Sequence, residues 1–242
     1  MKKTAIAIST TLALCGTLVW IATIGADTAL SIKNKGYVSV KGYAKQTIKS
    51  NMGMFGATIK AKSPELQPAY DKLAADRKAT LAFLKPYEFP DKDVRFSPVE
   101  VAEKHKVTER GYDTHEFVHF GLSQTVRAQS SDVEKIARLS AEIGEILGQG
   151  VELVISAPEY IYTGLEELKV EMIGLATASA AERAKTIAQK GGFKLGNIAS
   201  VRVGIFQITP AYSTEVHDYG INDTTSIDKE IKSVVDVQYF VR

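Results

Sequence analysis

The chain contains only one cysteine, Cys15, in 242 residues. Cys15 lies in an apolar run near the amino terminus, so the residues after that run have no cysteine at all. Disulfide bridges, a cysteine nucleophile and a thiol redox sensor are therefore excluded from the rest of the chain. Leu14 stands where a bacterial lipidation motif has a small residue, and we interpret Cys15 as a plain membrane-buried thiol rather than a lipid attachment site.

An excess of charge of either sign is also lacking. The sequence has 30 Lys and Arg against 28 Asp and Glu, and Lys2 and Lys3 account for the difference of two. Proteins that bind nucleic acid have clustered basic residues that neutralise phosphates, and no such excess is present here. We expect no nucleic-acid partner.

The first 26 residues carry a targeting signal. Two lysines precede residues 5–24, which contain no charged side chain, and Trp20 lies near the far end of this run. The length suits a membrane span, whereas a cleavable signal has a shorter apolar stretch that ends in small residues. Residues 1–26 are therefore a signal peptide or a membrane anchor, with 27–35 as a tether. Both interpretations predict an exported body, either held at a membrane with Lys2 and Lys3 on the cytoplasmic side, or soluble after cleavage.

Alternating polar and apolar residues predict strands in the remaining chain. The alternation begins at Gly36, and a second strand is expected over residues 54–62. Asn51 and Gly53 lie near the junction, so these two strands are predicted to form a hairpin. Further strands are expected near residues 93–104, 113–127, 151–156, 198–208 and 234–241.

Capping residues and helical spacing predict two helices before residue 150. Ser63 and Pro64 are suitable for the start of the first, and Pro86 for its end. Ser131 and Glu134 match a capping box at the start of the second. Its apolar stripe consists of Val133, Ile136, Ile143 and Leu147.

A third and longer helix is expected over residues 165–190. Thr163 and Glu166 match a second capping box, and Gly191 and Gly192 follow the helix as expected of a C-cap. A row of small residues at four-residue intervals would let this helix approach a sheet or a partner helix closely: Ala176, Ala180, Ala184 and Ala188.

This order of elements predicts an α+β fold with mostly antiparallel sheets and helices packed on one face, preceded by an N-terminal hydrophobic helix. We expect two subdomains, one formed by residues 36–105 together with 198–242, and the other by residues 106–197. A long connection, residues 209–232, separates the last two strands and is expected to be an ordered functional or assembly loop.

One motif matches a metalloenzyme pattern. His115, Glu116 and His119 spell HEFVH, in which two histidines would bind zinc and the glutamate would activate water. That chemistry requires a helix, whereas this segment alternates as a strand. In a strand the α-carbons of the two histidines would lie about 13 Å apart, at ~3.3 Å per residue. A zinc hydrolase therefore stays the least favoured alternative, and we expect no catalytic, cofactor-binding or metal-binding residues.

Two further motifs match functional patterns only in part. Ser226 and Lys229 have the serine-lysine spacing of some acyl-transfer enzymes, but the companion motifs SDN and KTG are absent. We interpret them as a helix-capping serine followed by a solvated lysine. Gly191, Gly192 and Gly196 fit neither GxGxxG nor GxxxxGK[ST], and they are interpreted as residues that follow a helix.

Other candidate metal ligands are scattered. His105 and His217 lack a companion at ligand spacing, and both are predicted to be surface residues. Four polar residues of the long connection could hold a cation weakly, although they miss the spacing of an EF-hand: Asp218, Asn222, Asp223 and Asp228.

The long helix and its exit carry a resemblance to a known family. The string ATASAAERAKTIAQKGGFKLG, residues 176–196, resembles the signature of SIMPL-domain proteins, in which an alanine-rich helix leads into a Gly-x-x-Leu-Gly exit. VSVKGYA at 38–44, Gly111-Tyr112 and SAPEY at 156–160 resemble the family in the same order, so the resemblance covers about residues 36–242. One difference is Ser50-Asn51, where many relatives have an aspartate.

This resemblance implies a bacterial envelope protein, periplasmic or membrane-anchored, that forms large homo-oligomers and contributes to tolerance of oxidative and other envelope stress. The family supplies no agreed catalytic residues. We therefore expect a non-enzymatic protein, held at the membrane through residues 5–24, whose body assembles into a ring or cage. The alternative is a periplasmic binding or scaffold module that contacts a small ligand or protein through the loop around Tyr212 and Tyr219.

Overall fold

The computed structural model describes residues 36–242, which form two compact units. Unit 1 comprises residues 36–44, 173–204 and 233–242, and unit 2 comprises residues 45–172 and 205–232. The boundaries of these units differ from those of the predicted subdomains, 36–105 with 198–242 and 106–197. The predicted membrane segment, its Cys15 and Trp20, and the tether at 27–35 lie outside the described residues.

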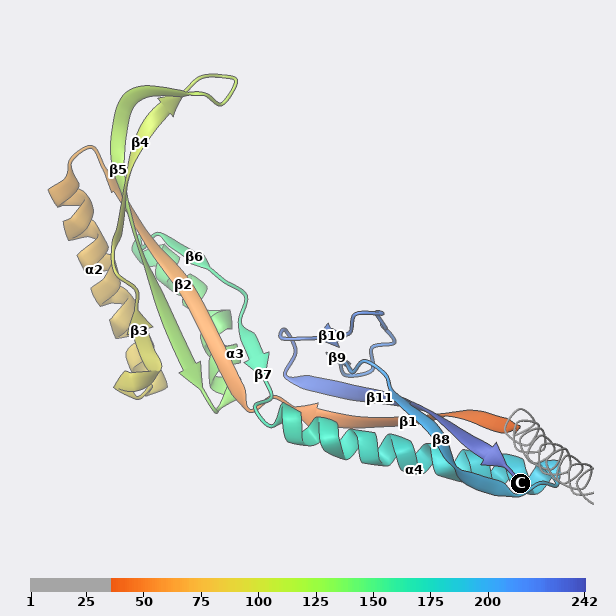
Figure 1. Cartoon of the computed structure of the whole chain (residues 1–242). Helices are drawn as coiled ribbons and strands as arrows, with labels where there is room; N and C mark the ends of the chain where they lie inside the picture. The colour runs from red at the N-terminus through yellow and green to blue at the C-terminus, as the bar shows by residue number, and fades with distance from the viewer. Residues whose placement is uncertain (1–35) are drawn as a thin grey trace, which may run out of the picture. The chain divides into compact units, whose positions relative to one another are not determined.

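Unit 2 is built on a six-stranded antiparallel sheet (Figure 1). The long strand β2 pairs with the second part of β5, from Gly53 opposite Ser130 to Ser63 opposite Phe120. Shorter strands flank this pair on both sides. The strands are β2 (Met52–Ser63), β3 (Val94–Phe96), β4 (Glu100–Val107), β5 (Asp113–Ser130), β6 (Leu153–Ile155) and β7 (Glu159–Ile161).

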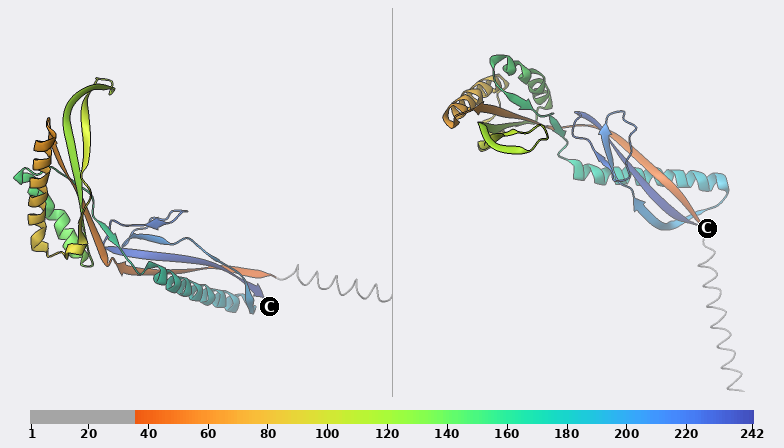
Figure 2. Two further views of the ribbon diagram at one scale, coloured as in Figure 1. Left: turned by 60° about the vertical axis from the view of Figure 1, so that its left-hand side comes forward. Right: turned by 90° about the horizontal axis from the view of Figure 1, so that it is seen from above.

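Two helices cover one face of this sheet, α2 (Leu66–Leu84) and α3 (Val133–Glu142). In β2 every second residue from Phe55 to Ala61 is buried, which is the alternation of a strand with one covered face. Phe55 and Ala57 pack with apolar residues of α3, whereas Ile59 and Ala61 pack with Ala69 and Leu73 of α2. Both helices therefore lie on the same face, and Figure 2 shows them together on that side.

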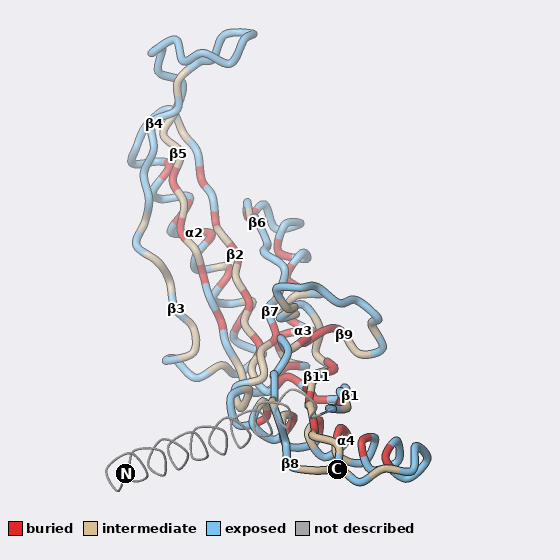
Figure 3. Tube along the Cα trace, turned by 45° about the vertical axis from the view of Figure 1, so that its right-hand side comes forward, coloured by how far each residue is buried: buried red, intermediate tan, exposed pale blue. Residues whose placement is uncertain are grey.

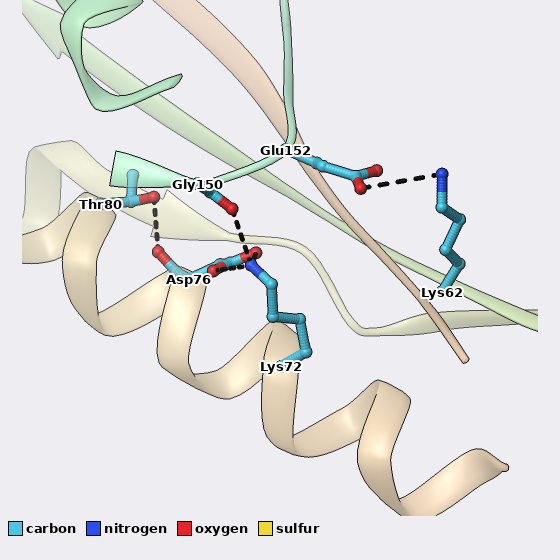
Figure 4. A network of polar contacts seen from close by, with 6 residues as sticks. All are labelled: Lys62, Lys72, Asp76, Thr80, Gly150 and Glu152. Carbon is cyan, nitrogen blue, oxygen red and sulfur yellow. Dashed lines mark hydrogen bonds and ion pairs between the residues drawn. The ribbon is translucent and has the colours of Figure 1, made fainter. Parts of the chain in front are cut away.

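A polar contact joins α2 to the end of the α3 region (Figure 4). Asp76 is buried within α2, and the ammonium of Lys72 lies 2.6 Å from its Oδ2 atom. The same ammonium donates a hydrogen bond to the carbonyl oxygen of Gly150 at 2.9 Å. This buried carboxylate thus has its charge partner, as buried charges in proteins require.

Unit 1 contains the long helix α4 (Leu165–Gly191) from residue 173 onward, packed on three strands (Figure 1). These strands are β1 (Tyr37–Lys49) up to residue 44, β8 (Leu195–Val203), and β11 (Asp228–Val241) from residue 233, with β11 between the other two. Two further strands of this five-stranded sheet, β9 (Gln207–Pro210) and β10 (Ile221–Asn222), belong to unit 2.

The small-residue row of α4 faces the sheet, as its spacing predicted. The alanines at 176, 180, 184 and 188 are all buried. Gly42 of β1 lies directly under them, and a β-carbon added to Gly42 would come within 1.9 Å of the carbonyl oxygen of Ala176. The alanines and this glycine together allow the close approach of helix and strand.

The predicted α+β class with mostly antiparallel sheets is confirmed, and the described residues contain the three predicted helices. The predicted hairpin of the first two strands is wrong. β1 pairs with β11, whereas β2 pairs with β5. The junction makes no tight turn because the amides of Ser50 and Asn51 donate to the carbonyl oxygens of Ile227 and Ile161.

Several predicted element ends also differ. The predicted strand over 93–104 is divided in two at Ser97, whose hydroxyl accepts a hydrogen bond from the amide of Thr125. The second helix is capped by Asp132 rather than by Ser131. Leu147 is exposed because α3 ends at Glu142 and the chain continues as a 3-10 segment, Ile143–Gln149.

Candidate functional site

The most exposed element of unit 2 is the outer part of the β4–β5 ribbon. β2 ends opposite Phe120, so beyond that point β4 and β5 pair only with each other. We call residues 103–120 the arm. Figure 3 shows it exposed as far as its tip. Phe120 at its base packs against the cluster that includes Leu73 of α2, but in the described residues no third strand pairs with the part of the arm beyond this point.

Several apolar side chains of the arm are exposed to solvent. Val107 is 63% exposed and Tyr112 is 69% exposed, and Phe117 and Val118 are also exposed. An isolated two-stranded ribbon is marginally stable in water, and clustered exposed apolar side chains commonly mark interaction surfaces. The arm is therefore a candidate contact surface.

The tip of the arm has a defined turn. The amide of Tyr112 donates to the hydroxyl of Thr108, and the amide of Thr108 donates to the carbonyl oxygen of Tyr112 at 2.8 Å. Gly111 adopts a φ of +82°, a conformation that glycine adopts without steric cost. These bonds fix the backbone at Tyr112, whose side chain is exposed.

A polar cluster lies next to this turn. Nδ1 of His105 is 3.3 Å from Oδ2 of Asp113, and the rings of His105 and His115 have their centres 6.4 Å apart. The amide of His115 donates to Oδ1 of Asp113 at 2.7 Å, and this hydrogen bond is the main reason that the pKa of Asp113 lies below its usual value. His115 has a φ of +60° and is held in it by that bond. His105 thus has companions that the sequence spacing did not indicate, because they come from the paired strand.

The HEFVH segment lies in a strand, as predicted, although His115 itself departs from the extended conformation. His115, Glu116 and His119 all lie in β5, where His119 is opposite Lys104. Glu116 forms an ion pair with Lys106 at 3.3 Å across the ribbon. The two histidines of the motif therefore do not converge on one point. Within residues 36–242, no three His, Cys, Asp or Glu side chains are arranged to hold a metal ion.

The long connection between β9 and β11 presents a second exposed surface. Tyr212 is 94% exposed and Tyr219 is 82% exposed, and the ring of His217 stacks on Tyr219 with centres 5.3 Å apart. Gln207 fixes this loop, since its side chain donates to the carbonyl oxygen of His217 and accepts from the amide of the same residue.

Lys229 anchors the base of this loop, and its interpretation as a solvated lysine is wrong. Its side chain is 2% exposed and lies in β11, so Ser226 caps no helix there. The ammonium donates to the carbonyl oxygens of Tyr160, at 2.8 Å, and of Asp223. Burial lowers the pKa of Lys229, and the carboxylate of Asp223 at 3.8 Å opposes that effect only in part.

The side chain of Asp223 also takes part in contacts at the base of this loop. Its Oδ1 accepts hydrogen bonds from the amide and the hydroxyl of Thr225 at 2.8 and 2.7 Å. Burial would raise the pKa of Asp223, but bonds from Thr225 and Ser226 and the charge of Lys229 bring it below the usual value. The carboxylate that was considered as a cation ligand therefore stabilises the loop instead.

The glycines after α4 have the predicted role. α4 ends at Gly191, and Gly192 has a φ of +72°, the left-handed conformation of a helix C-cap. Gly196 lies in β8, where an added β-carbon would come within 3.1 Å of Phe240. These glycines serve chain geometry and form no phosphate loop.

No helix within residues 36–242 has both the length and the apolar character needed to cross a bilayer. A search among curated proteins found no match to this chain. The family model described as SIMPL, protein of unknown function (DUF541), matches residues 38–239, which include all the surfaces described above. The chain therefore belongs to the SIMPL family.

Proposed function

We propose that this protein is a non-enzymatic assembly protein whose body forms a closed homo-oligomer through the arm. The observation that carries the proposal is the uncovered two-stranded ribbon with exposed apolar side chains on it, among them Val107, Tyr112 and Val118. Burying such side chains against a second copy stabilises the ribbon by about 25 cal/mol for each Å² of apolar surface removed from water.

A free strand edge in unit 1 supports the same proposal. Among the described strands β8 pairs only with β11, so its other edge has no strand partner. Exposed Ile198, Val201 and Val203 lie along this nine-residue strand. A long apolar edge strand is a template for pairing with another chain unless it is covered. Two different contact surfaces on one chain fit a head-to-tail assembly, which remains finite when it closes into a ring.

The test is mass photometry of the full-length protein in detergent, comparing two valine variants. Val107→Glu places a charge on the arm, and Val170→Glu places the same charge on an equally exposed valine of α4. We expect the wild-type protein and Val170→Glu to form the same large particle, and Val107→Glu to shift it to smaller species. A wild-type protein that is monomeric at micromolar concentration would refute the proposal.

A second candidate function is capture of a ligand or protein partner by the loop after β9. It is favoured by the nearly complete exposure of Tyr212 and Tyr219 in a loop whose base is fixed by buried Lys229. Aromatic side chains on a rigid support are effective binding anchors. Replacing both tyrosines by serine separates the two functions, because loss of partner capture with intact particles would favour this candidate.

The proposal places the protein in the bacterial envelope. The body would lie in the periplasm, either retained through residues 5–24 or released by cleavage, and it would contribute to tolerance of oxidative and other envelope stress. Because Cys15 is the only cysteine, that contribution would not involve thiol chemistry of the body. Mass spectrometry of the mature amino terminus distinguishes retention from cleavage. Growth of a deletion strain under peroxide, restored by the wild-type gene and not by Val107→Glu, would link the stress role to assembly.

A further inference from the structure

The face of the unit 2 sheet that lacks helices contains two arginines directly opposite each other. Arg95 of β3 is in register with Arg127 of β5. The residues next to Arg127 in β5, Val126 and Ala128, are buried on the helix-covered face, so Arg127 points to the other side. Neither α2 nor α3 lies on that side (Figure 2).

Neither arginine has a charge partner. Within the described residues no carboxylate lies within ion-pair distance of either guanidinium. Among residues 36–242, the only side-chain hydrogen bond of this pair runs from Nε of Arg95 to the carbonyl oxygen of Lys92 at 3.4 Å. Like charges directly opposite each other in a sheet destabilise it. This register places two positive charges on neighbouring strands, and an anion bound between them would offset their mutual repulsion.

The arginines line a hollow that is large enough for a small ligand. Its volume is about 650 Å³, and Lys92, Ser97 and Thr125 also line it. The hydroxyl of Thr125, which lines the hollow, hydrogen-bonds to that of Thr58 at 3.0 Å. On the edge of β5 that pairs with β2, Gly56 lies opposite Arg127. It has no side chain to add to this face.

The two acids that line the hollow form no ion pair with the arginines, and the lining as a whole keeps an excess of one positive charge. Asp93 accepts a hydrogen bond from the side chain of Gln129 at 3.0 Å, and Glu100 accepts one from the hydroxyl of Ser123 at 3.4 Å. With Lys92, three basic side chains thus face two acidic ones that bind neutral groups.

We propose that this hollow binds a phosphate group, either as inorganic phosphate or as part of a phosphomonoester. A guanidinium presents a planar fork of N–H donors that matches a phosphate or carboxylate, and two opposed forks together supply two positive charges. A phosphate monoester carries a charge of about −1.5 to −2 at neutral pH, which matches that pair better than a single carboxylate does. The inference does not depend on the assembly function.

The experiment is isothermal titration calorimetry of the full-length protein with inorganic phosphate and with glycerol phosphate, using acetate as the control anion. We expect saturable binding of the phosphates and much weaker binding of acetate. Arg95→Gln and Arg127→Gln should each weaken phosphate binding by about tenfold or more, because each removes a charge-assisted contact. The matched control is Arg110→Gln in the exposed turn of the arm, which should bind phosphate as the wild-type protein does.

Two further readouts complete the test. Without phosphate, Arg127→Gln should unfold at a temperature no lower than the wild-type protein and form the same particles, which separates this inference from the assembly proposal. Binding to vesicles that contain phosphatidic acid is compared with binding to phosphatidylcholine vesicles. If only the phosphatidic acid vesicles bind, and binding is lost in Arg127→Gln, the phosphate is that of a lipid headgroup. Absence of saturable binding to every phosphate probe, or equal weakening by Arg110→Gln, would overturn the inference.

Discussion

At the scale of single residues, the two ion pairs in Figure 4 differ in burial and should differ in their contribution to stability. Asp76 is buried and receives Lys72, whereas Lys62 and Glu152 are exposed and lie 3.8 Å apart. We expect Lys72→Ala to lower the free energy of unfolding by about 1–3 kcal/mol, because it leaves the buried Asp76 carboxylate without its charge partner. Lys62→Ala should change it by less than about 1 kcal/mol. Urea denaturation of the two variants side by side measures this, and equal losses would contradict it.

The hydroxyl of Tyr87 gives a prediction for alkaline pH. Burial and a hydrogen bond to Glu142 raise the pKa of Tyr87 from 10.0 to about 12. Between these values the folded protein keeps a proton that the unfolded chain loses, so this stabilising contribution is complete below pH 10 and is lost as the pH rises to 12. The wild-type protein should therefore lose more stability over this range than Tyr87→Phe. Urea midpoints at a series of pH values test this, and parallel curves for the two proteins would refute it.

At the scale of elements, the packing of α4 on β1 depends on the absence of a side chain at Gly42. We expect Gly42→Ala to lower the free energy of unfolding by roughly 1–3 kcal/mol or more, because the new methyl group would overlap the carbonyl of Ala176. Gly174→Ala is the matched control within α4, since no atom lies within 4 Å of the added methyl group. It should stabilise the protein by about 0.5–1 kcal/mol, the difference in helix propensity. Thermal unfolding followed by circular dichroism compares the two, and a stable Gly42→Ala would contradict the packing argument.

For these elements, the sequence predicted features that depend on neighbouring residues, and it missed the pairing of distant strands. The alanine row of α4 and the glycine after it are short-range patterns, and the structure confirms both. The partner of β1 could not be found in this way, because it is β11 at the opposite end of the chain. A hairpin was expected near Asn51 and Gly53, but the amide of Ser50 at this junction donates to the distant Ile227 instead.

For the candidate sites as well, the sequence predicted local features and missed contacts between distant residues. The alternation in HEFVH correctly predicted an extended segment, which removed the geometry that a zinc site requires. The burial of Lys229 was missed because it depends on Tyr160, a residue of another strand that is remote in sequence. Arg95 and Arg127 were not recognised as a pair because only the register of β3 against β5 brings them together.

At the scale of the whole molecule, the assembly proposal makes the arm the part whose environment changes with concentration. In a free chain, the backbone amides between Phe120 and the tip of the arm form hydrogen bonds only within a two-stranded ribbon. Such a ribbon opens easily. In an assembled particle the same ribbon would be covered and would open less often.

Hydrogen exchange measured over a dilution series therefore gives a specific expectation. Peptides from residues 103–120 should exchange slowly at concentrations where particles form and faster once dilution dissociates them. Peptides from β2 should exchange at the same slow rate throughout, because β2 is paired with β5, β6 and β7 in the single chain. Val107→Glu should show fast exchange in the arm at every concentration, and Val170→Glu should behave as the wild-type protein does. If particles form and dissociate while exchange in the arm stays constant, the copies contact each other through another surface, and the exposed edge of β8 becomes the next to test.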